Sequence, residues 1–150
     1  MAAKRVDIIR LEKVKESSFL YQERVISSPQ TAANLFRAQL EVRDRECFMV
    51  AYLSTKYEPI ALEVISIGTL NASLVHPREV FKGALLSNSA TIMLGHNHPS
   101  GLVEPSPEDR AITKRLQEAG MILGIEVLDH IIIGSKGRYL SFKESGYLTL

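Results

Sequence analysis

Two histidines separated by a single residue, His96 and His98, are the side chains in this chain with the spacing to hold a metal ion together. The apolar run over residues 91–95 just before them predicts a buried strand. Side chains alternate between the two faces of a strand, so both imidazoles project from the same face at its end. Two ring nitrogens placed in this way can bind one zinc ion at about 2.0–2.1 Å.

Asp109 could complete such a site, because it follows His98 after ten intervening residues and falls at the start of a predicted helix. Its carboxylate would add an oxygen ligand to the two nitrogens. Three protein ligands that leave the fourth position to water are typical of a catalytic zinc site and not of a structural one. The sequence therefore predicts zinc bound by His96, His98 and Asp109.

The same stretch also has a purely structural interpretation. Residues 99–101, Pro-Ser-Gly, are typical of a turn. Residues 106–109 have the form of a helix N-terminus, in which Ser106 caps the helix and Asp109 completes a capping box. On this interpretation the histidines bind no metal.

Hydrolysis at such a zinc site needs a base that takes a proton from water and passes it to the leaving amine. Glu63 is the candidate, because it interrupts the otherwise apolar predicted strand over residues 61–66, where a charged side chain has a desolvation cost. Burial would also move its pKa toward neutrality. Alternatively, Glu63 faces solvent, and Glu46 and Glu79 remain as candidates. Glu79 also fits an exposed residue in the first turn of a helix.

The remaining histidines have less specific settings. His76 precedes a proline and fits a turn or a position just before a helix. His130 lies in an apolar run after Asp129 and fits a buried, hydrogen-bonded histidine. A contact from His130 to a metal ligand stays open.

The spacing of His96, His98, Ser106 and Asp109 resembles the signature of the JAMM (MPN+) metalloproteases. Longer strings are similar to the bacterial RadC-like branch of that family, namely Gly68-Thr69-Leu70-Asn71, Val75-His76-Pro77-Arg78-Glu79-Val80, His96-Asn97-His98-Pro99-Ser100-Gly101 and Asp129-His130-Ile131-Ile132-Ile133-Gly134. The resemblance extends from about residue 28 to about residue 146. It implies a zinc-binding α/β domain of JAMM/MPN-like, cytidine-deaminase-like architecture, similar to de-ubiquitinating isopeptidases.

The resemblance also implies roles for two residues. Glu63 looks like the upstream glutamate of the family. Ser106 matches the serine that is taken to donate a hydrogen bond to the oxyanion of the tetrahedral intermediate. One hydroxyl cannot easily cap a helix and serve an oxyanion at full strength, so both roles of Ser106 stay open. RadC-like proteins carry a historical DNA-repair label, which does not define a substrate.

Alternating and helical patterns predict the elements that must position these residues. Helices are expected over residues 28–41, 78–86 and 107–119, and strands over 48–53, 61–66, 91–95, 126–133 and 139–142. The spacing of the first two strands favours an antiparallel hairpin. The sequence therefore predicts one α/β domain over residues 28–150, with a mixed, mostly buried sheet flanked by helices in two or three layers. An arm over residues 1–27 precedes it, with a possible edge strand at 5–14.

Composition limits the classes of function. The net charge is only +1, with acidic and basic residues interspersed, which argues against tight non-specific DNA binding. The single cysteine, Cys47, cannot form an internal disulfide and fits a reduced core residue. No stretch approaches the roughly 20 apolar residues of a membrane span, and early charges do not suit a signal peptide. We therefore expect a cytoplasmic protein without membrane association.

Three rival classes can be weighed. The letters of His96-Asn97-His98 match the name of the HNH nucleases, but in those enzymes the three residues are spread over a ββα element. A zinc nucleobase deaminase needs His-x-Glu and a later Pro-Cys-x-x-Cys, which the single Cys47 excludes. The remaining alternative is a non-catalytic or DNA-repair-associated binding module that retains the metal site. The preferred hypothesis is a JAMM-type zinc hydrolase that acts on a protein or peptide substrate.

Overall fold

The computed structural model describes residues 1–68 and 75–148 of the chain. Within these ranges the elements are α1 (Pro29–Leu40), β1 (Cys47–Leu53), β2 (Pro59–Ile67), α2 (Pro77–Leu86), β3 (Thr91–Asn97), α3 (Pro107–Leu123), β4 (Glu126–Ile133) and β5 (Tyr139–Ser141). Residues 69–71 of the Gly68–Asn71 string lie outside the described residues.

The described strands form one sheet in the order β2-β1-β3-β4-β5. β1 runs antiparallel to both β2 and β3, which confirms the predicted hairpin. β3 and β4 are parallel, because α3 carries the chain back across the sheet between them. The sheet is therefore mixed, as the sequence predicts.

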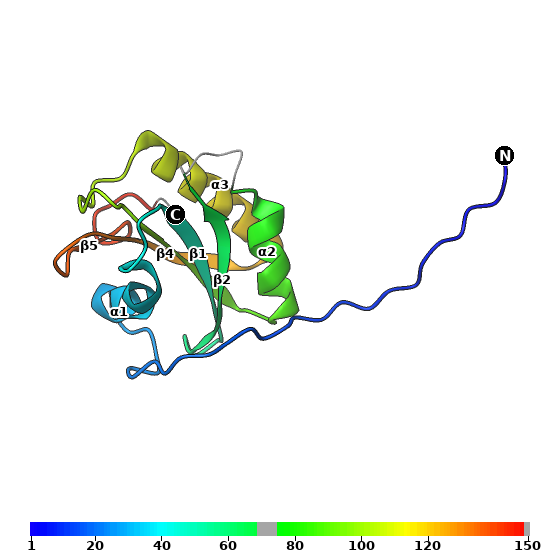
Figure 1. Ribbon diagram of the computed structural model, residues 1–150, viewed down its shortest axis with the longest axis horizontal. Helices are drawn as coiled ribbons and strands as arrows, with labels where there is room; N and C mark the ends of the chain where they lie inside the picture. The colour runs from blue at the N-terminus through cyan, green and yellow to red at the C-terminus, as the bar shows by residue number, and fades with distance from the viewer. Residues whose placement is uncertain (69–74, 149–150) are drawn as a thin grey trace.

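Helices cover both faces of this sheet (Figure 1). α1 packs on one face, where every second residue of β1, from Met49 to Leu53, contributes to its core. α2 and α3 pack on the other face, against the alternate residues from Phe48 to Tyr52. Burial on both sides explains why β1 is apolar throughout and not alternating. The predicted α/β domain is confirmed, in its three-layer form.

Each helix begins with a cap followed by proline. Ser28 and Ser106 form capping boxes at α1 and α3, and the box at Ser106 is the one that the sequence predicts. His76 caps α2, where its side chain accepts a hydrogen bond from the Arg78 amide, so its predicted position before a helix is confirmed.

α3 is longer than the predicted helix over residues 107–119, because Gly120 lies inside it. A Cβ at Gly120 would collide with the backbone oxygen of Ile125. Glycine is thus needed there for the close return of the chain, and not to end the helix. Gly124 ends α3, in the left-handed conformation with a φ of 72°.

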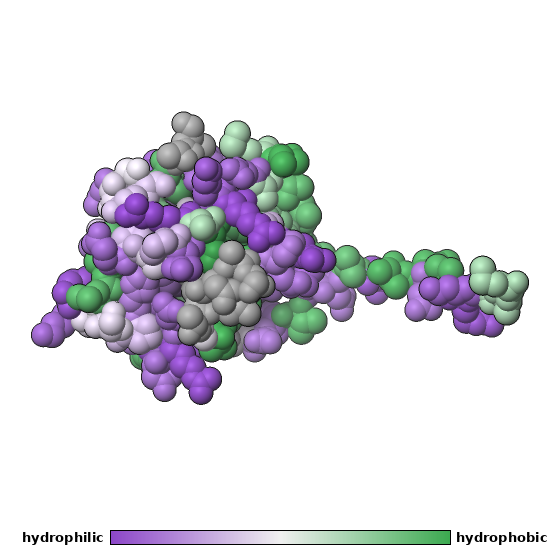
Figure 2. Space-filling model, turned by 90° about the horizontal axis from the view of Figure 1, so that it is seen from above, coloured by the Kyte–Doolittle hydropathy of each residue, from purple (hydrophilic) through white to green (hydrophobic). Residues whose placement is uncertain are grey.

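The arm forms no strand over residues 5–14, so that prediction is wrong. Its apolar side chains, such as Ile8 and Leu11, are exposed, and the space-filling view shows the arm projecting from the body (Figure 2). An alternating pattern gives a strand only where a neighbouring strand can pair with it. Packing begins at Tyr21 and Ile26, which join the core under α1, slightly before the predicted boundary.

No helix in the described part of the chain is long and apolar enough to cross a membrane.

The contact between α2 and β1 depends on Gly83. The Tyr52 hydroxyl donates a hydrogen bond to Glu63 beneath it, and both side chains lie against this glycine. An added Cβ at Gly83 would lie 2.6 Å from Tyr52 Cζ, and Tyr52 is buried. The helix backbone therefore approaches the sheet as closely as a glycine allows.

We predict that Gly83→Ala lowers the free energy of unfolding by up to about 2 kcal/mol, because overpacking costs about 1–3 kcal/mol. The gain in helix propensity, about 1 kcal/mol, offsets only part of this cost. Urea denaturation followed by circular dichroism measures the change. Lys82→Ala, at an exposed position of the same helix, is the control and should stay within about 0.5 kcal/mol. A more stable Gly83→Ala variant would contradict the close packing.

Candidate metal centre

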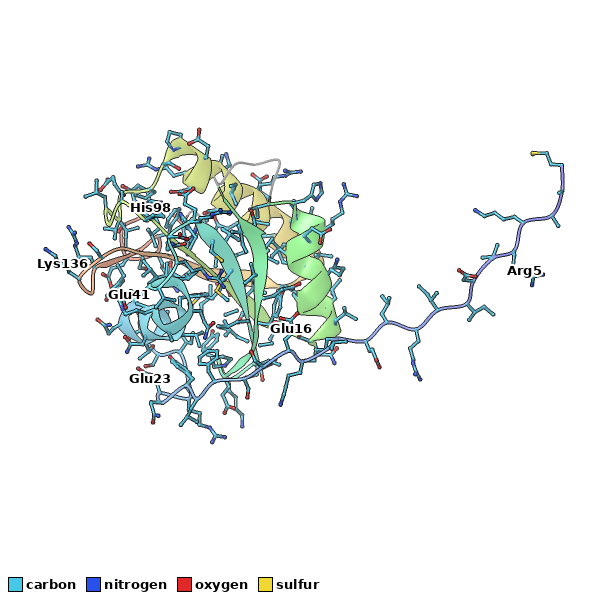
Figure 3. All side chains as sticks on the ribbon, in the orientation of Figure 1. Arg5, Glu16, Glu23, Glu41, His98 and Lys136 are labelled. Atoms are coloured by element: carbon cyan, nitrogen blue, oxygen red, sulfur yellow. The ribbon has the colours of Figure 1, made fainter. Side chains whose placement is uncertain are left out.

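His96 and His98 lie at the end of β3, on the face covered by α3. β3 extends two residues beyond its predicted end, so His96 pairs with Phe48 of β1, and the amide of His98 donates to the Ile133 carbonyl. As predicted, the two rings project to the same side, with their Nε2 atoms 3.0 Å apart. His98 lies near the loop that leads into α3 (Figure 3).

Asp109 reaches both histidines from the first turn of α3. Its Oδ1 lies 3.2 Å from His96 Nε2 and its Oδ2 lies 3.1 Å from His98 Nε2. The same carboxylate accepts a hydrogen bond from the Ser106 amide at 2.8 Å, and the Asp109 amide donates to Ser106 Oγ at 3.0 Å. The capping box and the ligand position are thus compatible, because the cap orients the carboxylate toward the histidines.

These groups are shielded unequally from solvent. The side chains of His96 and Asp109 are only 1% and 2% exposed, whereas that of His98 is 12% exposed. The Nδ1 of His98 lies 2.9 Å from the Leu102 carbonyl, which can only accept, so this nitrogen carries the proton. When the ring of His98 is neutral, its Nε2 therefore has its lone pair free toward Asp109.

The donor set fits a metal ion. His96, His98 and Asp109 bring nitrogen and oxygen atoms within 3.0–3.2 Å of one another. Ligands of tetrahedral zinc, each at about 2.0–2.1 Å from the metal, lie about 3.3 Å apart. Three acceptors that converge in this way, of which His96 and Asp109 are buried, repel one another unless a cation lies among them. The site could therefore hold a divalent metal that accepts nitrogen and oxygen ligands.

The pKa shifts of Asp109 and His98 also indicate that a positive charge stabilises this site. Burial raises the pKa of Asp109, but the hydrogen bonds that His96 and His98 can donate when their Nε2 atoms carry a proton outweigh it and hold the pKa well below its ordinary value. Burial lowers the pKa of His98, but the adjacent Asp109 carboxylate outweighs it and the net pKa is raised. A proton can supply this charge where no metal is bound, and a metal ion would replace that proton.

Glu46 is the carboxylate that the fold brings beside the histidines. An oxygen of Glu46 and one ring nitrogen each of His96 and His98 all lie within 4.8 Å of one another. Asn97, whose side chain lies on the opposite face from the two rings, holds the segment that carries Glu46. It accepts from the Cys47 amide at 2.7 Å and donates to the Arg45 carbonyl at 2.9 Å. The backbone on both sides of Glu46 is thereby fixed to the end of β3.

The structure does not bring Glu63 to the histidines. Glu63 pairs with Val50 and accepts its hydrogen bond from Tyr52, whereas His96 pairs with Phe48. Glu63 thus lies two residues, or about 7 Å, along the strand from the Phe48–His96 pair, and two strands, or about 10 Å, away across the sheet. The Tyr52 hydroxyl, and not a metal, accounts for the carboxylate within this apolar strand. Of the other predicted candidates, Glu79 is exposed and pairs with Lys82 at 3.1 Å.

His130 is buried and hydrogen-bonded, as predicted, and it contacts a candidate metal ligand. Its Nε2 lies 2.7 Å from His96 Nδ1, and its Nδ1 lies 2.6 Å from the Thr113 hydroxyl. Burial lowers the pKa of His130 well below its ordinary value, so the ring is neutral. Sequence reasoning did not identify Thr113, because a threonine within an amphipathic helix has no distinctive signal. Thr113 lies one helical turn after Asp109. Its role becomes visible only in the structure, where β4 brings His130 against it.

Comparison with known proteins gives consistent matches. A profile of the RadC-like JAB domain matches residues 26–147. A UPF0758 protein of Rubrobacter xylanophilus is 56% identical over 124 residues, which are 83% of this chain and 54% of that protein. A UPF0758 protein of Methanosarcina mazei is 46% identical over 147 residues, which are 98% of this chain and 64% of that protein. The chain thus spans between about half and two thirds of the length of these relatives.

These names state no activity, but the profile covers α1 to β5 and all the residues of the candidate metal centre. The chain therefore belongs to the RadC family, and its residues 26–147 form a RadC-like JAB domain.

Proposed function

We propose that this domain is a JAMM-type zinc hydrolase that cleaves an amide bond in a protein or peptide. The observation that carries the proposal is the convergence of His96, His98 and Asp109, with Glu46 beside the histidines. A structural zinc site would be closed by four protein ligands, whereas three ligands leave a position for water. Of these three side chains, that of His98 is the most exposed, so water and substrate would approach from its side.

When bound, zinc would lower the pKa of the water in its open position and polarise the scissile carbonyl. Two carboxylates of the chain, Asp109 and Glu46, have different roles in this proposal. Asp109 contacts both histidines and takes the ligand position. Glu46 has an oxygen within 4.8 Å of a ring nitrogen of each histidine, and in this proposal it receives a proton from water and passes it to the leaving amine. This role falls to Glu46 in place of Glu63.

Ser106 can cap α3 and serve the oxyanion at the same time. A serine hydroxyl has one proton and two acceptor lone pairs. The cap uses a lone pair, because Ser106 Oγ accepts from the Asp109 amide. The hydroxyl proton is not used by this bond and can be donated to a developing negative charge.

We predict that the wild-type protein, purified without chelator, contains about one zinc ion per chain by elemental analysis. His98→Ala and Asp109→Ala should each lose it, because two remaining ligands hold zinc weakly. His76→Ala is the matched control, since His76 caps α2 and is not a ligand, and it should retain zinc. Wild-type protein that stays metal-free when zinc is supplied would refute the site.

We predict that Glu46→Gln lowers turnover by about 10²–10⁴-fold, the usual contribution of a general base, while zinc content stays unchanged. Glu63→Gln is the control and should retain turnover. The assay mixes the zinc-loaded protein with cellular peptides, both linear and branched through lysine isopeptide bonds, and counts new amino termini by mass spectrometry. Equal loss in both variants would contradict the assignment of Glu46. No zinc-dependent cleavage by the wild type would contradict the hydrolase itself.

We predict that Ser106→Ala lowers turnover by about 10²–10³-fold, as removal of an oxyanion donor does. The lost cap should reduce the free energy of unfolding by about 0.5–2 kcal/mol without removing zinc. Ser106→Thr retains the hydroxyl and should keep most of the turnover. The same cleavage assay and a urea titration separate the two effects. A Ser106→Ala variant with normal turnover would leave Ser106 with the capping role alone.

A further inference from the structure

A chain of three side chains connects α3 to the buried nitrogen of His96. Thr113 Oγ1 lies 2.7 Å from the backbone carbonyl of Asp109 and 2.6 Å from His130 Nδ1. His130 Nε2 in turn lies 2.7 Å from His96 Nδ1. All three side chains belong to residues that are at most 1% exposed, so water does not compete for these contacts.

The direction of each hydrogen bond follows from the carbonyl at the end of the chain. A carbonyl oxygen only accepts, so the Thr113 hydroxyl proton points to Asp109. The Thr113 oxygen then accepts from the proton on His130 Nδ1. A neutral His130 therefore has a bare Nε2, which accepts from His96 Nδ1–H. His96 is left with its lone pair on Nε2, the nitrogen that faces Asp109.

The opposite direction has a specific cost. If the Thr113 proton pointed to His130, the oxygens of Thr113 and Asp109 would face each other as two acceptors at 2.7 Å. His96 would then carry its proton on Nε2 and could not bind a metal through that atom.

We propose that Thr113 and His130 are positioning residues that hold His96 in the tautomer able to bind metal, an inference that rests on the proposed metal site. Groups behind a ligating histidine commonly fix its tautomer and orientation in this way. For His98, the backbone carbonyl of Leu102 fixes the tautomer, because it accepts a hydrogen bond from Nδ1. His96 depends instead on two side chains, so its tautomer can be changed by substitution.

Aromatic packing fixes the ring of His130. Phe142 stacks on it with ring centroids 4.4 Å apart and planes 19° apart. Phe48 meets it edge-on with centroids 5.7 Å apart, and Phe48 also lies against His96. A ring held on two sides cannot rotate freely to exchange its nitrogens, so the direction set at Thr113 is transmitted to His96.

The test compares Thr113→Val with Thr113→Ser. Valine keeps the shape of threonine but removes the hydroxyl, whereas serine keeps the hydroxyl and loses only the methyl group. We predict that Thr113→Val weakens zinc binding by about 10–100-fold, the usual effect of removing a group behind a metal ligand. Thr113→Ser should bind zinc within about 3-fold of the wild type. Competition with a chromophoric chelator gives the dissociation constants.

A second measurement needs no metal. Nitrogen-15 NMR of the metal-free wild type shows which ring nitrogen of His96 carries the proton. We predict a proton on Nδ1 in the wild type and in Thr113→Ser, and a shift of population toward Nε2–H in Thr113→Val. A wild type with its proton on Nε2 would overturn the inference.

The two measurements separate this inference from the proposed function. Zinc binding by the wild type with equal affinity in Thr113→Val would overturn the positioning role and leave the metal site intact. Absence of zinc binding by the wild type would overturn the metal site, while the NMR result would still decide how Thr113 and His130 act on His96.

Discussion

The structure of the site depends on one electrostatic constraint, the mutual repulsion of three converging acceptors. His96, His98 and Asp109 bring nitrogen and oxygen acceptor atoms within 3.0–3.2 Å of one another, and the side chains of His96 and Asp109 are buried. Such an arrangement is stable only with a cation among the three groups, whether a proton or a metal ion. The fold meets the geometric side of this requirement with regular elements. The end of β3 presents the histidines, and the capped start of α3 presents the carboxylate.

Each of these three groups is hydrogen-bonded to another of the described residues. The capping box orients Asp109, the Leu102 carbonyl orients His98, and His130 orients His96. Asn97 has a comparable effect on the opposite face, because its amide fixes the backbone on both sides of Glu46. Side chains whose rotamers are locked in this way need little reorganisation when a metal or a transition state forms.

Local signals in the sequence were sufficient to predict most of the fold and the side chains that converge at the candidate metal centre. The His-x-His spacing, the serine-proline helix starts and the apolar runs depend only on neighbouring residues, and the structure agrees with them. The arm over residues 5–14 was predicted incorrectly because a strand also needs a partner. The choice between Glu46 and Glu63 could not be made locally either. It depends on the register between β1, β2 and β3, which sets which carboxylate lies beside His96.

The most direct test of the account is to locate the metal. Anomalous diffraction at the zinc absorption edge, from crystals of the protein grown with zinc, identifies its position without reference to activity. The account predicts one strong peak within about 2.0–2.1 Å of the Nε2 atoms of His96 and His98 and of a carboxylate oxygen of Asp109. The absence of a peak there, or zinc bound only at surface residues such as His76, would contradict it.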